Sequence, residues 1–276
     1  TMNAITPKAL RAIRDLGATH VWYTGVIRHA TSQHNTPSIV KGKAGSPYAI
    51  TDYYDIDPDI CEDKRRRMHE FEELVERSHQ AKLDVIIDFV PNHVAREYHS
   101  TCKPKGVEDL GATDNPQWAF SPLNNFYYIH QPFAPSFDVE GYTENPTRAT
   151  GNDCFTAHPS KDDWYETVKL NYGVFYQGSG EQQFDPIPNT WHKMLHILLF
   201  WSNKGVDGFR CDMAEMVPQA FWAWVIPQVK AKYPNILFIA EVYNPNLYRE
   251  YLAAGFDYLY DKVGMYDYLR GVTSKN

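Results

Sequence analysis

The chain has 276 residues, of which 43% are hydrophobic and 22% are charged, and its formal net charge is −7. This composition is typical of a globular protein that is long enough for one barrel-sized domain or for two smaller domains. The negative charge gives no reason to expect a nucleic-acid partner, and no apolar run approaches the roughly 20 residues that a membrane-spanning helix needs.

Helical and strand-like patterns alternate along the chain. Apolar residues at helical spacing predict helices, and short apolar runs predict buried strands. In chain order, we predict a helix at 7–16, a strand at 19–23, a helix at 63–80, a strand at 84–90, a helix at 189–203, a strand at 206–212, a helix at 219–232, a strand at 236–242, a helix at 248–254 and a strand at 256–260. A loop is expected from the first strand to residue 54, and Pro227 could bend its helix.

Residues 94–175 have no long periodicity and are rich in Pro, Asn, Gly, Tyr and Trp. A loop of that length without its own structure is uncommon inside a compact domain. We therefore interpret this segment as an inserted subdomain, which divides the chain into residues 1–93, 94–175 and 176–276.

The alternation of helix and strand predicts an α/β fold with a parallel sheet, in which consecutive strands lie side by side. The strands are expected to be buried on both faces. Five strands suit an open, doubly wound sheet, and they also suit part of an eight-stranded barrel. The pattern alone does not decide between these two folds.

Three carboxylates stand at the carboxyl ends of three predicted strands, at the sheet edge where parallel α/β proteins bind ligands: Asp88, Asp212 and Glu241. Asp212 and Glu241 belong to consecutive strands. Neighbouring strands lie about 4.8 Å apart, so the two carboxyl groups could approach to roughly 5–6 Å. A separation near 5 Å is the geometry of retaining glycoside hydrolysis.

Arg210 lies two residues before Asp212 and hence on the same side of the strand. Its guanidinium should lower the pKa of Asp212 and keep this nucleophile ionised, whereas the apolar residues before Glu241 should raise the pKa of a general acid. Glu241 has no obvious ion-pair partner in the sequence. The alternative interpretation is a structural Arg210–Asp212 ion pair and an exposed strand end at Glu241.

Asn92 and His93 follow the strand that carries Asp88. His93 could contact a substrate or have a structural role, and Asn92 could offer an oxygen to a hard cation, although it has no acidic neighbours in the sequence. The four cysteines have no metal-type spacing. Cys211 is expected in the core, and spacing favours free thiols over a disulfide between Cys102 and Cys154.

Three motifs resemble signatures of the α-amylase family of glycoside hydrolases (family 13), and they occur in the family's order. They are DFVPNH at residues 88–93, GFRCDMAE at 208–215 and FIAEVY at 238–243. The segment at 94–175 is similar in position to the family's inserted B domain, and KLNY at 169–172 resembles an additional family motif. PY at 47–48, followed by TDYY at 51–54, looks like the loop whose tyrosine stacks on the sugar.

The resemblance implies a (β/α)8 barrel, retention of configuration and an α-linked oligo- or polysaccharide substrate. It makes Asp212 the nucleophile, Glu241 the acid/base and Arg210 the partner of the nucleophile. Tyr48 and His93 would hold the sugar, and Asp88 would support the site. This chemistry requires no cofactor, and the motifs do not support a calcium site.

Three departures from the family pattern matter. The fourth signature, a His-Asp pair whose aspartate stabilises the transition state, is absent, because no aspartate after Glu241 follows a histidine. The five strands would be barrel strands two to six. Glu215 and Met216 stand where starch-cleaving amylases often carry Lys-His, which weakens a transfer of endo-acting specificity and of the usual calcium site. We expect the isolated chain to be poorly active.

Three functions remain in competition at this stage. The leading hypothesis is a hydrolase of α-glucosidic bonds. The second is a transglycosylase or isomerase that shares the covalent intermediate. The third is a non-catalytic carbohydrate-binding relative of the family, which is disfavoured because Asp212, Glu241 and Arg210 are all present.

Overall fold

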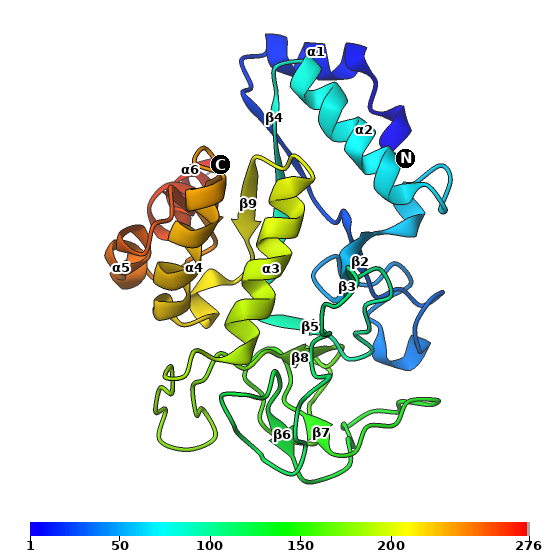
Figure 1. The fold of residues 1–276 in the computed structure, drawn as a ribbon, viewed down its shortest axis with the longest axis vertical. Coiled ribbons are helices and arrows are strands. Elements are labelled where there is room, and N and C mark those ends of the chain that lie inside the picture. Colours follow the sequence, from blue (N-terminus) through cyan, green and yellow to red (C-terminus); the bar gives the residue numbers. More distant parts are fainter. Residues whose placement is uncertain (275–276) are drawn as a thin grey trace.

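The computed structural model describes residues 1–274 (Figure 1). The largest sheet among these residues has five parallel strands. In spatial order the strands are β1 (His20–Tyr23), β4 (Asp84–Phe89), β9 (Gly208–Cys211), β10 (Leu237–Ala240) and β11 (Tyr258–Leu259). The order in space follows the order in the chain. In a doubly wound sheet the spatial order of the strands reverses at a switch point. An order that follows the chain throughout is therefore typical of a segment of a barrel.

The strand register brings the predicted site residues to one end of the sheet. Asp88 of β4 lies opposite Arg210 of β9. Just beyond the strand ends, the amide of Asp212 donates to the carbonyl of Phe89 at 2.8 Å, and the amide of Glu241 donates to the carbonyl of Cys211 at 3.1 Å. The ladder therefore continues far enough to fix the backbone of both acids.

The helices confirm most of the predicted pattern. They are α1 (Pro7–Asp15), α2 (Arg67–Gln80), α3 (Asn189–Asn203), α4 (Gln219–Lys232), α5 (Tyr248–Ala253) and α6 (Asp267–Thr273). Short helical turns occur at Met2–Ala4, Pro37–Ile39, Pro58–Ile60, Ala214–Met216, Pro245–Leu247 and Lys262–Tyr266. Helix α2 begins later than predicted because the side chain of Asp63 accepts from the amide of Arg65 and holds a turn before the helix. Helix α4 runs through Pro227 without ending.

Large aromatic side chains join the helices to the sheet in one core. Phe71 of α2 meets Trp201 of α3 edge to face, with ring centroids 5.5 Å apart. The Trp201 indole donates to the carbonyl of Tyr53 at 2.8 Å, so its one polar atom is satisfied. Burying each such side chain stabilises the fold by roughly 1.5–3 kcal/mol.

The predicted loop up to residue 54 is wrong in part, because it contains an antiparallel strand pair. Strand β2 (Ile27–His29) pairs with β3 (Ile50–Ile56), and every residue of β3 is buried. Asp52 and Asp55 interrupt the apolar pattern of this strand, so the sequence did not predict it. In the fold, both side chains have partners. Asp55 forms an ion pair with Arg67 at 2.6 Å, and Asp52 accepts from Ser100 at 2.6 Å.

The prediction that the strands are buried on both faces holds for the centre of the sheet and fails at its edges. Strands β4 and β9 are almost wholly buried. Trp22 of β1 is 44% exposed and Tyr258 of β11 is 59% exposed. Among the described residues neither edge strand has a second neighbour in this sheet, so their outer sides stay open.

The segment after β4 has little regular structure and lies at the end of the molecule opposite α1 (green in Figure 1). Its strands are β5 (His93–Ala95), β6 (Tyr128–Ile129), β7 (Thr147–Arg148) and β8 (Thr167–Lys169). Antiparallel pairing of β5 with β8 returns the end of the segment to its beginning. The pairing places His93 opposite Lys169, and the amide of Leu170 donates to the carbonyl of Asn92 at 2.9 Å, so the end of β8 lies beside the residues that follow β4.

The cysteines agree with a further expectation. All four thiols are free, and Cys61 and Cys211 are buried. Within residues 1–274, none of the helices combines the length and the apolar character that crossing a bilayer requires.

Candidate active site

One guanidinium joins the three predicted carboxylates. Arg210 contacts Asp212 at 2.8 Å and Asp88 at 3.3 Å through Nη1, and it contacts Glu241 at 2.7 Å through Nη2. Each of the four side chains is less than one-tenth exposed. The strand ends therefore bring the acids together as the register predicts, and a shared cation holds them there.

The expectation that Glu241 lacks an ion pair is wrong. Besides the contact with Arg210, Oε1 of Glu241 accepts from the hydroxyl of Tyr243. Oε2 accepts from the amide of Met213 at 2.8 Å. Both carboxylate oxygens thus have donors that hold the group in place, and Oε2, with one donor among the described residues, keeps a lone pair for a further hydrogen bond.

The expected lowering of the Asp212 pKa is also wrong. Burial raises the pKa of Asp212 to about 7; Arg210 opposes this rise, and the neighbouring Glu241 adds to it. The same cause, burial, raises the pKa of Asp88 against the opposing effect of Arg210. The physical reason is that the cost of burying the charged carboxylate exceeds the stabilisation that Arg210 provides, a guanidinium that also contacts Glu241.

The chain turns sharply directly after Asp212. Met213 has φ 45° and ψ 44°, a left-handed conformation that residues with a side chain rarely adopt. This turn points the Met213 amide toward Glu241. The unusual conformation therefore couples the end of β9 to the acid at the end of β10.

The acids open into a cavity of about 300 Å³. Its lining is formed by Ser46, Tyr48, His93, Trp164, Glu166, Thr167, Arg210, Asp212, Met213 and Glu241. Five of the six predicted site residues belong to this lining. The sixth, Asp88, lies behind Arg210, where its second oxygen accepts from the Trp22 indole at 3.3 Å.

The two predicted sugar-binding residues flank the acids from different segments. The ring of Tyr48 lies 5.5 Å from the Arg210 guanidinium. His93 is buried, with its ring centroid 5.3 Å from that of Trp164. Burial lowers the pKa of His93 to about 3, and the charge of Lys169 acts in the same direction. His93 is therefore neutral at physiological pH and can both donate and accept a hydrogen bond.

An ammonium group already occupies the oxygen that Asn92 could offer to a cation. Lys169 donates to Oδ1 of Asn92 at 2.7 Å and pairs with Asp153, also at 2.7 Å. The Lys169 side chain is only 2% exposed. The ammonium group of Lys169 thus joins the segment at 94–175 to the residues that follow β4.

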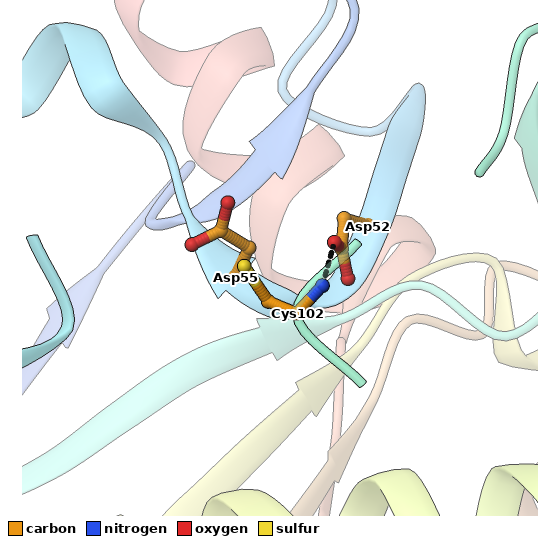
Figure 2. A group of neighbouring side chains, drawn as sticks. All are labelled: Asp52, Asp55 and Cys102. Carbon is orange, nitrogen blue, oxygen red and sulfur yellow. Dashed lines mark hydrogen bonds between the residues drawn. The ribbon is translucent and has the colours of Figure 1, made fainter. Parts of the chain in front are cut away.

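A second group of possible metal ligands lies outside the cavity. Figure 2 shows Asp52, Asp55 and Cys102, whose ligand atoms lie within 4.8 Å of one another. However, Arg67 supplies the positive charge here, because it donates to both oxygens of Asp55 at 2.6 and 2.8 Å. Asp52 accepts from the backbone amides of Thr101 and Cys102. These contacts explain the cluster without an ion.

Several residues near the acids were not found from the sequence. Tyr243 and Tyr260 donate to or accept from the central groups, the latter accepting from Nε of Arg210 at 2.9 Å. Tyr243 could have been found, because it lies two residues after Glu241 and strand residues alternate in direction. Trp164 and Glu166 carry no such signal, since residues 94–175 have no long periodicity.

The residues that depart from the family motifs have other contacts. Asp257 pairs with Lys230 at 2.7 Å, and Asp267 pairs with Lys262. Glu215 accepts from the amide of Tyr243 at 3.2 Å and so supports the loop after β10. None of these carboxylates belongs to the lining of the cavity among the residues that the structure describes.

Comparisons with known proteins agree with this geometry. The family model described as alpha amylase, catalytic domain, matches residues 1–251. An alpha-1,4-glucan:maltose-1-phosphate maltosyltransferase from Cereibacter sphaeroides is 25% identical over 97% of the chain and 39% of its own length. Alpha-amylase 3 from Dictyoglomus thermophilum is 26% identical over 71% of the chain and 33% of its own length.

A solved structure, that of an alpha-amylase from Lactobacillus plantarum, is similar over 98% of the chain and 51% of its own length. The TM-score is 0.62 and the identity is 26%. The chain thus spans between a third and about half of the relatives it matches. The five-stranded sheet corresponds to a fragment of a (β/α)8 barrel.

Proposed function

This chain belongs to the α-amylase family, and from that membership we propose that it carries the two reacting acids of a retaining hydrolase of α-glucosidic bonds. Asp212 is the nucleophile and Glu241 is the acid/base. The observation that supports this most directly is that both carboxylates bind the same guanidinium and line the same cavity.

The proposed reaction has two displacements. In the first, an oxygen of Asp212 attacks the anomeric carbon, the bond to the leaving-group oxygen breaks, and Glu241 gives that oxygen its proton. In the second, Glu241 removes a proton from water, which attacks the anomeric carbon and releases Asp212. Retention follows because the carbon is inverted twice. The neighbouring strands of the two acids suit the short separation that this route needs.

The remaining predicted residues have supporting roles. Tyr48 offers an aromatic face to the sugar at the reacting position, and neutral His93 offers a hydrogen bond. Arg210 holds Asp212 and Glu241 in place, and Asp88 with the Trp22 indole fixes Arg210 from behind. The substrate class is an α-linked oligo- or polysaccharide.

We also propose how the chain corresponds to a complete barrel. Residues 1–93 and 176–276 would supply barrel strands two to six, and residues 94–175 would be the inserted B domain. The aspartate of the fourth family signature and the other strands would then come from elsewhere in a longer protein. On this proposal the 276 residues alone are poorly active.

The test is Asp212→Asn in the protein that contains this chain. We expect turnover of malto-oligosaccharides to fall by roughly 10³-fold or more, because the amide is no nucleophile. Binding of the same sugar should persist, since the fold and the aromatic contacts remain. The exposed substitution Asp15→Asn serves as the control. Retained turnover in Asp212→Asn would exclude the proposed role.

A second candidate is a transglycosylase, because one relative is a maltosyltransferase by name. Hydrolysis and transfer share the first displacement and differ in the acceptor of the second. Incubation with maltose separates them: glucose alone indicates hydrolysis, whereas rearranged or longer saccharides indicate transfer. Sugar binding by the unaltered protein without any turnover would instead support a non-catalytic carbohydrate-binding protein.

A further inference from the structure

The cavity contains a third carboxylate that the proposed reaction does not use. Glu166 lies directly before β8 and is only 6% exposed. Its Oε2 accepts from the amide of Lys41 at 2.9 Å. Within residues 1–274, its other oxygen has no hydrogen-bond partner, and the side chain lines the same cavity as Asp212 and Glu241.

The backbone on both sides of Glu166 is held in place. Its carbonyl accepts from the amide of Arg96 at 2.9 Å, and the amide of Thr167 donates to the carbonyl of Trp164 at 2.8 Å. Arg96 is itself buried and paired with Glu144 at 2.9 Å. The Glu166 side chain, which lines the cavity, is therefore carried by a backbone that is fixed on both sides.

The charges of the lining are unbalanced. Among the described residues of the lining, three are carboxylates and the single Lys or Arg is Arg210. Arg210 already serves Asp88, Asp212 and Glu241. The nearby ammonium groups have other partners: that of Lys41 donates to the carbonyl of Asp163 at 2.7 Å, and that of Lys169 is held by Asn92 and Asp153.

This excess of acidic over basic groups should favour a neutral sugar over a phosphorylated one. A neutral sugar unit offers hydroxyl donors to an unpartnered carboxylate oxygen, which is a strong, charge-assisted hydrogen bond. A phosphorylated sugar brings further negative charge into this cavity. The single Lys or Arg among the described residues of the lining is already shared by several carboxylates, so the phosphate should be repelled.

We propose that Glu166 is a specificity-determining residue that binds a hydroxyl of a neutral sugar unit and disfavours a phosphorylated one. This inference rests on the proposed function, because it names the substrate class of the same cavity. Glu166 is a binding residue in this scheme and takes no part in proton transfer or bond cleavage.

The experiment compares maltose and maltose 1-phosphate as ligands in titration calorimetry at about pH 8, well above the ordinary pKa of a carboxyl group. In the unaltered protein maltose should bind more tightly. In Glu166→Gln, maltose should bind roughly tenfold more weakly, because a hydrogen bond to a charged group is lost. The preference for maltose over its phosphate should also shrink by roughly threefold or more.

Two further variants separate the causes. Glu140→Gln changes an exposed acid of the same segment and should leave both affinities unchanged. Glu166→Asp keeps the charge, but its side chain is one methylene shorter, so the carboxylate oxygens lie farther from the sugar. It should therefore weaken maltose binding while keeping the preference for the unphosphorylated sugar. Thermal unfolding of each variant shows whether the fold is intact, and Glu166→Asp still decides the question if Glu166→Gln does not fold.

The outcomes distinguish this inference from the proposed function. Unchanged maltose affinity in folded Glu166→Gln and Glu166→Asp overturns the inference alone. Tighter binding of the phosphate than of maltose by the unaltered protein also overturns it. If the unaltered protein binds neither sugar, the proposed function fails together with the inference.

Discussion

At the scale of single residues, the site is governed by one cation among several acids. Arg210 contacts Asp88, Asp212 and Glu241 and also donates to Tyr260. The cluster therefore has more acidic than basic groups in a buried environment. Such a site stabilises protonated carboxyl groups, and it should attract the positive charge that develops at an anomeric carbon during glycoside cleavage.

The raised pKa of Asp212 predicts a pH dependence of stability. The pKa rises from 3.8 to about 7, chiefly through burial, so the folded state binds this proton more tightly than the unfolded chain does. The stabilising contribution is fully present below about pH 4 and is lost as the pH rises through about 7. Asp212→Asn cannot titrate, so its free energy of unfolding should increase relative to the unaltered protein over this range.

Urea unfolding at several pH values measures this difference. The exposed Asp15→Asn variant should show a constant difference across the same range. A constant difference for Asp212→Asn as well would contradict the raised pKa of Asp212.

Lys169 supports a second residue-scale prediction. Lys169→Met keeps the apolar stem but removes the ammonium that joins Asn92 to Asp153. We expect a loss of roughly 2 kcal/mol in stability, less than for a fully buried pair because Asp153 is partly exposed. The exposed Lys161→Met variant should be neutral. The positive charge at this site is that of Lys169 and not of a metal ion, so a chelator should leave the melting temperature unchanged. A large decrease with the chelator would contradict this role of Lys169.

At the scale of elements, the end of α2 stores backbone strain. Lys82 follows the helix with φ 61°, and its amide donates to the carbonyl of His79 at 2.8 Å. Glycine is the usual residue at such a position, because it has no Cβ to clash in the left-handed region. Lys82 is exposed, so its side chain contributes little to packing.

Lys82→Gly should therefore stabilise the protein by about 0.5–1 kcal/mol. Lys82→Ala removes the same charge but keeps the Cβ, and it should give no comparable gain. Thermal unfolding of both variants tests the prediction. Equal melting temperatures would show that the left-handed backbone conformation costs little here.

At the scale of the whole molecule, the sheet has two open edges. Strands β1 and β11 each pair on one side within the described residues, and Tyr258 on β11 is 59% exposed. Unpaired strand edges are templates for association with other chains. We expect the isolated 276-residue chain to associate as its concentration rises.

Sedimentation at several concentrations measures this association. Tyr258→Lys places a charge on the open edge and should reduce it. Leu16→Lys changes a residue that is 88% exposed but follows helix α1, so it should have little effect. Equal association of the two variants would indicate that contacts other than the strand edge are responsible.

Local patterns along the chain are enough to predict the framework and the principal residues. The bounds of α3 and α4, the five parallel strands and the meeting of Asp212 with Glu241 all follow from local periodicity and from the polarity of parallel strands. These signals are local, because burial of one face repeats every two or 3.6 residues. The three motifs predicted the family on the same basis, as short stretches of neighbouring residues.

Burial, pKa values and access to the cavity depend on distances between remote segments, so they became visible only in the folded arrangement. The burial of Asp55 in β3 requires Arg67, the pKa of Asp212 depends on three acids sharing Arg210, and Glu166 reaches the cavity through the pairing of β5 with β8. Electrostatic energies depend on separation in space and on burial. Neither quantity is encoded in the spacing of residues along the chain.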